Sequence, residues 1–433
     1  MKKECTKKMK KVFLLLFVSV ISLSVLIACS TDGKTNEQVN DSKSKSEIIN
    51  LEFAVKETGS TLEAYETIVS KFNSENDDVN IEVVSYGKDY GSLLKAKMAS
   101  NDLPDLWTTH GWAVFLYGEY LLPLNEQPWT DDLIPEIKPT MTDLDGNIVA
   151  LPLDIDISGM IYNKTILNEL SIEIPKNQEE FIAACAKIKE AGYTPVHIAG
   201  KDASDVAGLV SRVSLSTLTT SKTNNYADQL YDGTFDWSNY NKVSDFILSL
   251  VKNGYTNVDY LTADKSGTFN GFAQNKVAFA FQSNGTLAEV SKINPNADVA
   301  MMKIPGYTSG DEPFLISGER DAVGVWKDTE YKEEALKFLK YLAKPENVLA
   351  VSEAYSLPPS MKGVKSDVES INNLLNQLEG TKVTNHFDRE YLPNGMWSTL
   401  KAFGPGVLSD ELTPEEGSEL MEKEYNRLRE VNN

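Results

Sequence analysis

Apolar positions along the chain alternate between the spacing of buried strands and the spacing of helices. Residues 48–55 combine alternation with apolar pairs, which is typical of a largely buried strand. Residues 62–72 then carry apolar side chains at helical spacing, and residues 79–84 predict a second strand. Strands that alternate with helices predict an α/β fold, in which a mainly parallel sheet is covered by helices on both faces.

The same pattern resumes in the second half of the chain. Asn177 followed by Glu180 predicts the N-terminus of a helix, and Gly192 predicts its end. Within this helix Phe181, Cys185 and Ile188 share one face, so we expect Cys185 to be a core residue rather than a nucleophile. Later elements are a strand at 277–281, a strand at 322–326 and a helix at 333–342.

The first 29 residues have the layout of a secretion signal. Six lysines fall within the first eleven residues, and an apolar run from residue 12 to residue 28 follows them. This layout predicts a signal peptide, because the run is too short to span a membrane comfortably. The run ends in Leu26-Ile27-Ala28-Cys29, which resembles the lipobox of bacterial lipoproteins. The resemblance implies cleavage after residue 28 and lipidation of Cys29; a plain signal peptide and an uncleaved anchor are the alternatives.

Residues 29–47 predict a lipid-anchored flexible linker. Residues 30–47 contain one aliphatic residue, Val39, among polar and charged ones. Such a segment cannot bury enough apolar surface to fold. The folded part is therefore expected to begin at about residue 48.

Charge and cysteine content exclude several classes of protein. The 433 residues include 42 Lys and Arg against 63 Asp and Glu, for a formal net charge of −21. This acidic balance argues against a nucleic-acid-binding surface, which needs clustered cations. After signal cleavage and lipidation, Cys185 is the one remaining free cysteine of three. Neither an intrachain disulfide nor a cysteine-rich metal site is therefore expected.

Several short motifs occur in an order that is typical of one protein family. After the helix at 62–72 come NIEV (80–83), ASNDLPDL (99–106), LLPL (121–124), DGNIVALP (145–152), IYNK (161–164), IP (174–175), EEF (179–181) and AGYTP (191–195). Together these motifs resemble the family-one extracellular solute-binding proteins, the lipid-anchored carbohydrate receptors of bacterial ABC importers, which are similar to maltose-binding protein. The resemblance covers nearly all of residues 48–433.

The resemblance implies a periplasmic-binding-protein type II fold, with two α/β lobes and a ligand cleft at the hinge. The chain is expected to cross between the lobes near residues 154–156, 303–306 and 357–360. The first lobe is then 48–153 with 304–357, and the second lobe is 156–303 with 358–433. Such lobes close around a ligand by hinge bending.

The resemblance also implies a function and its partners. Members bind a mono- or oligosaccharide and deliver it to the permease subunits of an ABC importer. We expect a monomer on the extracellular face of the cell membrane, held there by its lipid anchor alone. The lysine-rich signal favours a Gram-positive host. No catalytic residue, metal or cofactor is expected.

Sugar sites combine aromatic rings, which stack on pyranose rings, with planar polar groups that hydrogen-bond the hydroxyls. The loops that follow predicted strands, together with the hinge segments, supply both kinds of side chain. The candidates for ligand contact are Glu57, Trp107, His110, Trp112, Asp154, Asp156, Tyr162, Asn284, Glu319, Arg320 and Trp397.

Several candidates also have a structural explanation. Trp107 could belong to the core, since the predicted strand could include it. Tyr162 could serve a structural role within the Tyr-Asn-Lys motif. Glu319 and Arg320 could form a surface ion pair instead of binding a ligand.

Asp154 and Asp156 leave other functions open. Because they lie two residues apart in an extended segment, both could point to one side and accept sugar hydroxyls, or remain solvated hinge carboxylates. They could also be the acid and base of a glycosidase. A receptor of the same fold for a polyamine, a peptide or iron, and an adhesin, are further alternatives. The tryptophans and the family motifs favour a sugar receptor.

Overall fold

The computed structural model describes residues 48–432 apart from residues 110, 112, 144 and 379. The predictions for the signal peptide, the lipidated Cys29 and the linker lie outside these described residues, and so do the ligand contacts predicted for His110 and Trp112. None of the helices in the described part of the chain is long and apolar enough to cross a bilayer.

The first sheet has five strands in the order β2-β1-β3-β11-β4. They are β1 (Ile49–Val55), β2 (Val79–Ser85), β3 (Leu106–Thr108), β4 (Leu151–Pro152) and β11 (Ala322–Val325). β1 runs parallel to β2 and β3, whereas β11 runs antiparallel to β3 and β4. Helices α1 (Ser60–Glu75), α11 (Lys332–Leu342) and α12 (Pro345–Ala354) pack together beside it, and Phe53 of β1 meets Tyr65 and Phe338 edge to face.

The second sheet has four strands in the order β7-β8-β6-β9. They are β6 (Met160–Asn163), β7 (Thr194–Val196), β8 (Val277–Ala280) and β9 (Val299–Met302). β7 is parallel to β8, and β6 is antiparallel to both β8 and β9. Its helices are α4 (Lys164–Glu169), α5 (Gln178–Glu190), α6 (Ala203–Ser214), α8 (Asn241–Lys252), α9 (Lys265–Ala273), α10 (Gly285–Ile293), α15 (Met396–Leu408) and α16 (Pro414–Asn432).

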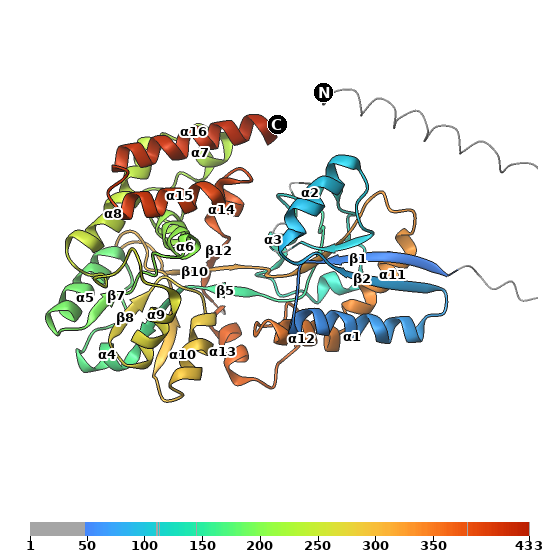
Figure 1. Ribbon diagram of the computed structural model, residues 1–433, viewed down its shortest axis with the longest axis horizontal. Helices are drawn as coiled ribbons and strands as arrows, with labels where there is room; N and C mark the ends of the chain where they lie inside the picture. The colour runs from blue at the N-terminus through green and yellow to red at the C-terminus, as the bar shows by residue number, and fades with distance from the viewer. Residues whose placement is uncertain (1–47, 110, 112, 144, 379, 433) are drawn as a thin grey trace, which may run out of the picture. The chain divides into compact units, whose positions relative to one another are not determined.

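A third sheet of three strands, β12-β10-β5, lies between the other two (Figure 1). It contains β5 (Asp156–Ser158), β10 (Phe314–Gly318) and β12 (Lys382–Thr384), with β10 antiparallel to β5 and parallel to β12. The chain passes from the first sheet to the third between β4 and β5, and it returns between β10 and β11. We call this sheet the hinge sheet, because the chain crosses between the two larger sheets through it.

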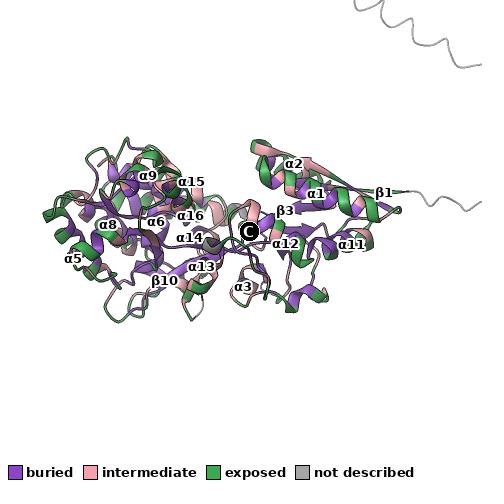
Figure 2. Cartoon of the chain, turned by 90° about the horizontal axis from the view of Figure 1, so that it is seen from below, coloured by how far each residue is buried: buried purple, intermediate pink, exposed green. Residues whose placement is uncertain are grey.

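Shorter helices complete the described chain. The α-helices are α2 (Tyr90–Ser100), α3 (Lys138–Met141), α7 (Ala227–Asp232), α13 (Glu369–Leu378) and α14 (Phe387–Glu390). A π-helical turn at Leu215–Thr219 extends α6, and 3₁₀ turns span Gly87–Asp89, Gly118–Tyr120, Pro128–Asp131 and Trp237–Tyr240. Figure 2 shows β3 and β10 as buried, whereas the exposed residues lie on the outer faces of helices such as α5 and α11.

Local sequence signals of α5 are confirmed. Asn177 is the N-cap, and its side-chain oxygen accepts the backbone N–H of Glu180 at 2.9 Å, while the Glu180 carboxylate accepts from the Asn177 amide at 2.8 Å. The helix ends before Gly192, which has φ of 86°. Cys185 is fully buried in the core, and burial raises the pKa of its thiol, so it is the inert core residue that the pattern predicts.

The two-lobed α/β class is confirmed, but the prediction of mainly parallel sheets is wrong. β6 is antiparallel to both of its neighbours, and β11 and β4 each have only antiparallel pairings. The strand by which the chain re-enters a sheet from the hinge runs opposite to the strand by which it left. The spacing of residues within a strand carries no information on that direction.

Residues 304–318 pack against segments that the resemblance assigns to the second lobe. Gly306 pairs with Asn177, and the Ser216 hydroxyl donates to the Pro305 carbonyl at 2.7 Å. The backbone N–H of Lys222 donates to Asp311 at 2.7 Å. The predicted lobe boundaries remain a prediction, and these contacts favour a crossover at residues 318–321 over one at 303–306.

Candidate functional site

Polar residues gather where strands of the first sheet meet the hinge sheet. Lys56 and Glu57 follow β1, Asp154 lies two residues after β4, and Arg320 and Asp321 come just before β11. Because β11 is antiparallel to β3 and β4, and β1 is parallel to β3, these segments meet at one edge of the sheet. Ligands of open α/β sheets bind outside the carboxyl ends of the parallel strands, so this edge is a candidate binding site.

Asp154 joins two crossover segments. Its Oδ1 accepts the backbone N–H groups of Arg320, at 2.7 Å, and of Asp321, at 3.2 Å. The side chain is fully buried, and its Oδ2 has no hydrogen-bond partner among the described residues. Burial raises the pKa of Asp154 well above its usual range, although the two backbone hydrogen bonds oppose that shift. Asp154 therefore has a structural task in holding the two segments together.

Asp321 is the centre of a second buried network. The hydroxyls of Tyr65 and Tyr355 donate to its Oδ2, at 2.5 and 3.4 Å. Beside it the Thr108 hydroxyl donates to Glu57 Oε2 at 3.2 Å. Burial, and then the charge of Glu57, raises the pKa of Asp321 well above its usual range. Burial and the neighbouring carboxyl therefore favour the protonated form of Asp321.

One face of the hinge sheet carries a second group of polar side chains. Asp156 of β5 pairs in register with Gly318 of β10, so both lie on the same face. A Cβ atom on Gly318 would lie 3.5 Å from Asn385 Oδ1, 3.9 Å from Arg389 Nη1 and 4.0 Å from His386 Cδ2. Burial and the charge of Arg389 lower the pKa of His386 well below its usual range, so its imidazole is neutral. A carboxylate, an amide, an imidazole and a guanidinium therefore lie around a residue that has no side chain.

Arg212 of α6 hydrogen-bonds to the residues that connect the hinge sheet to the second sheet. Its Nε donates to the Gly159 carbonyl at 2.9 Å, its Nη2 to the Ser158 hydroxyl at 2.5 Å and its Nη1 to the Gly208 carbonyl at 2.9 Å. Burial lowers the pKa of Arg212 to about 10, and the nearby charge of Asp156 opposes that shift. Since its side chain is buried and all three of its guanidinium nitrogens donate to the protein, Arg212 positions the end of β5 rather than reaching out to a ligand.

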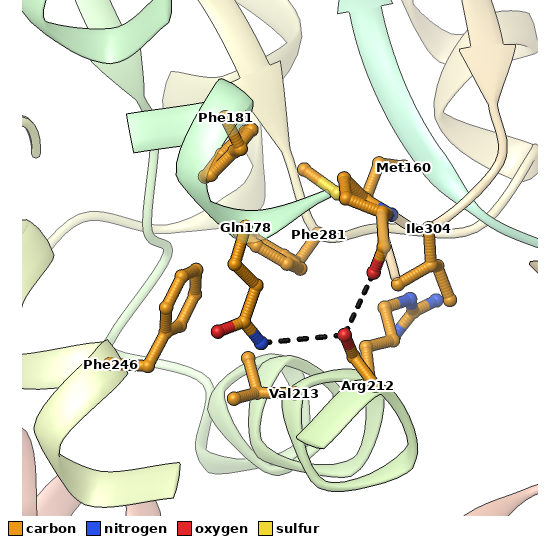
Figure 3. Close-up of a pocket in the computed structure, with 10 residues that line it drawn as sticks. Met160, Gln178, Phe181, Arg212, Val213, Phe246, Phe281 and Ile304 are labelled. Atoms are coloured by element: carbon orange, nitrogen blue, oxygen red, sulfur yellow. Dashed lines mark hydrogen bonds between the residues drawn. The ribbon is translucent and has the colours of Figure 1, made fainter. Parts of the chain in front are cut away.

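A small cavity beside Arg212 is not large enough for a sugar. It has a volume of about 10 Å³ and is lined by Gln178, Phe181, Phe246 and Phe281, among others (Figure 3). A space of this size holds one water molecule at most. It is a packing defect of the second lobe.

A larger cavity lies at the opposite edge of the hinge sheet, beside β12. Its volume is about 520 Å³, within the usual range for small-molecule sites. Its lining is rich in hydroxyl groups and comprises Val114, Phe115, Glu136, Pro139, Thr140, Thr142, Thr219, Thr220, Ser317, Lys382, Val383, Thr384, Asn385, Glu390 and Tyr391. None of the predicted ligand residues that the structure describes lines this cavity.

The structure brings four of the predicted ligand residues to the hinge. Glu57 and Asp154 lie at the edge of the first sheet, and Asp156 is partly exposed on the hinge sheet. Arg320 is exposed, with its guanidinium 5.8 Å from the centre of the Tyr355 ring. Their predicted contacts with a ligand remain predictions.

Glu319 precedes Arg320 in the sequence, but its side chain is buried, whereas Arg320 is exposed. The Glu319 side chain is 3% exposed and lies near Thr140, Ala113 and Arg389. Burial raises the pKa of Glu319 to about 7, although these partners oppose the shift. The Glu319 carboxyl therefore lies among groups of the protein rather than at the surface.

The other predicted residues lie apart from this group. Trp107 is fully buried and meets the Tyr117 ring at 5.9 Å between ring centres, in the core position that was its structural alternative. Tyr162 is buried within β6, and Asn284 is buried where α10 begins. Trp397 is half-buried in the first turn of α15 and packs against the core of the second lobe.

Sequence reasoning missed His386, Arg389 and Tyr355. The first two follow β12, a three-residue strand whose period is too short to recognise in the sequence. A polar run, Asn385-His386 followed by Asp388-Arg389, was the one available signal. Its position opposite Gly318 depends on strand pairing across more than sixty residues.

Comparisons with known proteins agree with this architecture. A model of the family described as bacterial extracellular solute-binding protein matches residues 67–376. The melibiose/raffinose/stachyose-binding protein MelE of Bacillus subtilis is 35% identical over 425 residues, which cover 98% of this chain and 97% of that protein. A multiple sugar-binding protein of Streptococcus mutans is 24% identical and covers 83% of this chain and 85% of its own length.

Solved structures share the fold along nearly their whole length. A binding protein of Bacillus subtilis in an open conformation is 34% identical, with a TM-score of 0.84, and covers 89% of this chain and 98% of its own. A sugar transporter protein of Bacillus licheniformis, solved in complex with stachyose, is 33% identical, with a TM-score of 0.74, and covers 88% of this chain and all of its own.

Proposed function

The chain belongs to the bacterial extracellular solute-binding proteins, and on that premise we propose that it is the receptor of an ABC importer for a galactose-containing oligosaccharide. The observation that carries the proposal is the 35% identity with MelE, which extends over both larger sheets and the hinge sheet. Melibiose, raffinose and stachyose share an α-galactosyl unit, so this unit is the part of the ligand that we expect to be recognised.

We place the sugar at the strand edge and on the face of the hinge sheet that carries Asp156. Carboxylate and guanidinium groups hydrogen-bond sugar hydroxyls in pairs, and Glu57, Asp156 and Arg320 supply both kinds. Trp397 lies apart from these groups in the first turn of α15, so its predicted stacking contact would be with another ring of the oligosaccharide. Asp154 and Asp321 support the site, since Asp154 Oδ1 accepts two backbone N–H groups and Asp321 Oδ2 accepts a tyrosine hydroxyl.

A binding role is favoured over a catalytic one. The family and the relatives named above are binding proteins rather than enzymes. A glycosidase built on Asp154 and Asp156 would need both carboxyls beside the scissile bond. Asp154 is fully buried and bound to backbone N–H groups, so it is poorly placed to reach a sugar.

The location and partners follow from the same proposal. A receptor of this family meets the permease of its importer on the outer side of the membrane. Lipidation at Cys29 would tether it there, with residues 30–47 as the flexible tether. We propose that the receptor acts as a monomer.

Isothermal titration calorimetry on residues 30–433 tests the ligand. Raffinose, stachyose and melibiose are titrated beside maltotriose, spermidine and a tripeptide, and the recovered sugar is analysed by chromatography. We expect saturable binding of at least one galactoside, which is recovered intact. Binding of spermidine or the tripeptide without any sugar would overturn the proposed ligand class, and hydrolysed raffinose would overturn the binding-only role.

A pair of variants tests the location. Asp156→Asn should weaken galactoside binding by tenfold or more, because a hydroxyl-accepting charge is lost. Thr142→Ala is the matched control, since Thr142 lines the cavity beside β12. The reverse pattern would move the sugar to that cavity.

A further inference from the structure

Arg389 links segments that are far apart in the sequence. It lies on α14, immediately after β12, and its Nη1 donates to the backbone carbonyl of Glu319 at 3.5 Å. Glu319 is in the segment by which the chain leaves the hinge sheet and enters β11. The charge of Arg389 also lowers the pKa of the buried Glu319 carboxyl, against the effect of burial. A side chain of the second half of the chain therefore holds a crossover segment.

The same guanidinium lies directly against Gly111 in the loop after β3. A Cβ atom on Gly111 would be 2.3 Å from Arg389 Nη1 and 2.5 Å from its Cζ, which is closer than any real contact. Gly111 also has φ of 81°, in the left-handed region. The backbone conformation favours glycine here, and any larger residue would have to displace the Arg389 guanidinium from its place against the Gly111 backbone.

Arg389 also approaches the face of the hinge sheet that carries Asp156. Its Nη1 would lie 3.9 Å from a Cβ atom on Gly318, the register partner of Asp156. One guanidinium thus reaches Gly111, Glu319 and the neighbourhood of Gly318. Because arginine presents several donors in a rigid planar fork, it can contact both the Gly111 loop and the Gly318-Glu319 segment at once, whereas lysine offers a single point of charge.

We propose that Arg389 is a positioning residue for ligand binding. It holds the segment around Gly111 against the hinge-sheet face that carries Asp156, and so fixes the position of that segment relative to the residues to which we assign the sugar. This inference rests on the proposed function, because the aligned residues are those to which we assign the sugar. Without Arg389, the Gly111 segment loses its partner and the ligand must order that segment at the expense of affinity.

A double-mutant cycle tests the contact. Arg389→Ala should weaken binding of the preferred galactoside about tenfold, and Gly111→Ala should weaken it at least as much. In the Arg389→Ala background, Gly111→Ala should cost less than it does in the wild type, because the clash with the guanidinium is gone and only the backbone strain of the positive φ remains. Arg427→Ala, on the exposed face of α16, is the matched control and should bind as the wild type does.

A purely structural role for Arg389 would give a different result. In that case Arg389→Ala would lower the melting temperature together with affinity. Wild-type affinity in Arg389→Ala, or additivity in the cycle, would overturn the proposal. Arg389→Lys should restore the charge but not the affinity.

A readout without sugar separates this inference from the proposed function. Hydrogen exchange of peptides covering residues 105–117 is compared between the unliganded wild type and Arg389→Ala. We expect about tenfold faster exchange in the variant at this segment, with no change in peptides from β1 or α16. Unchanged exchange would overturn the positioning role even if galactosides bind, whereas faster exchange in a protein that binds no sugar would overturn the ligand assignment alone.

Discussion

Asp154 and Arg320 are 166 residues apart in the sequence, yet the Asp154 carboxyl accepts the Arg320 backbone N–H at 2.7 Å. The same oxygen accepts the N–H of Asp321 at 3.2 Å. These hydrogen bonds join the segment that leaves the first sheet to the segment that returns to it. A hinge of two such strands moves as one piece, because neither segment can shift without breaking a buried hydrogen bond.

Asp154→Ala should lower the free energy of unfolding by about 1–3 kcal/mol, since two buried N–H groups lose their acceptor. Asp154→Asn should cost about 1 kcal/mol or less, because an amide oxygen can accept the same bonds and burial already favours the uncharged carboxyl. Urea unfolding of both variants measures the difference. An alanine variant as stable as the wild type would contradict the structural task that we assign to Asp154.

Trp397→Ala should weaken galactoside binding by about 0.5–1.5 kcal/mol, the usual contribution of an aromatic contact beyond its buried area. Calorimetry with the preferred sugar measures this loss. Trp237→Ala provides a comparison, because Trp237 is buried among aromatic rings of the second lobe. If Trp397→Ala binds as tightly as the wild type, Trp397 does not stack on the ligand.

The stability of the protein should depend on pH through Glu319. Its pKa is raised from the ordinary value of 4.5 to about 7 in the folded state, so the folded protein binds more protons than the unfolded chain between these pH values. Stability from this group is therefore present below about pH 4.5 and falls as pH rises through about 7. The total change is on the order of 3 kcal/mol.

Glu319→Gln isolates that contribution, because glutamine keeps the shape and does not titrate. The difference in unfolding free energy between the variant and the wild type should grow in favour of the variant between pH 4.5 and pH 8. Comparing differences removes the effect of other buried carboxyls such as Asp154 and Asp321. A difference that stays constant across this range would show that Glu319 titrates normally.

Cys29→Ala should abolish lipidation without altering ligand binding, because none of the residues to which we assign the ligand precedes residue 57. Fractionation of cells and metabolic labelling with a fatty acid measure the effect. The wild type is expected in the labelled membrane fraction, and the variant is expected unlabelled. A variant that remains labelled would place the lipidated residue elsewhere.

Much of the local structure could be predicted from neighbouring residues. The apolar spacing of residues 62–72 predicts α1, and an asparagine at 177 followed by a glutamate at 180 predicts where α5 begins. The burial of Cys185 follows from its position on the apolar face of that helix. The motifs from residue 80 to residue 195 correctly indicated the family.

The candidate site was predictable only in part. Glu57, Asp154, Asp156 and Arg320 could be singled out because polar residues at strand ends are typical of binding sites. The sequence did not reveal that the Asp154 carboxyl accepts hydrogen bonds from backbone N–H groups, or that Trp107 is fully buried. Both outcomes depend on which distant segment packs against the residue.

The sequence by itself determined the elements and the class of fold, because helix periodicity and capping involve residues within about four positions of one another. Only the tertiary structure decided the strand directions and the set of side chains around Gly318. Arg389 reaches Gly111 and Glu319 because β12 pairs with β10 and α14 follows it. Such contacts join segments hundreds of residues apart, and their partners are selected by the packing of the whole core rather than by any local pattern.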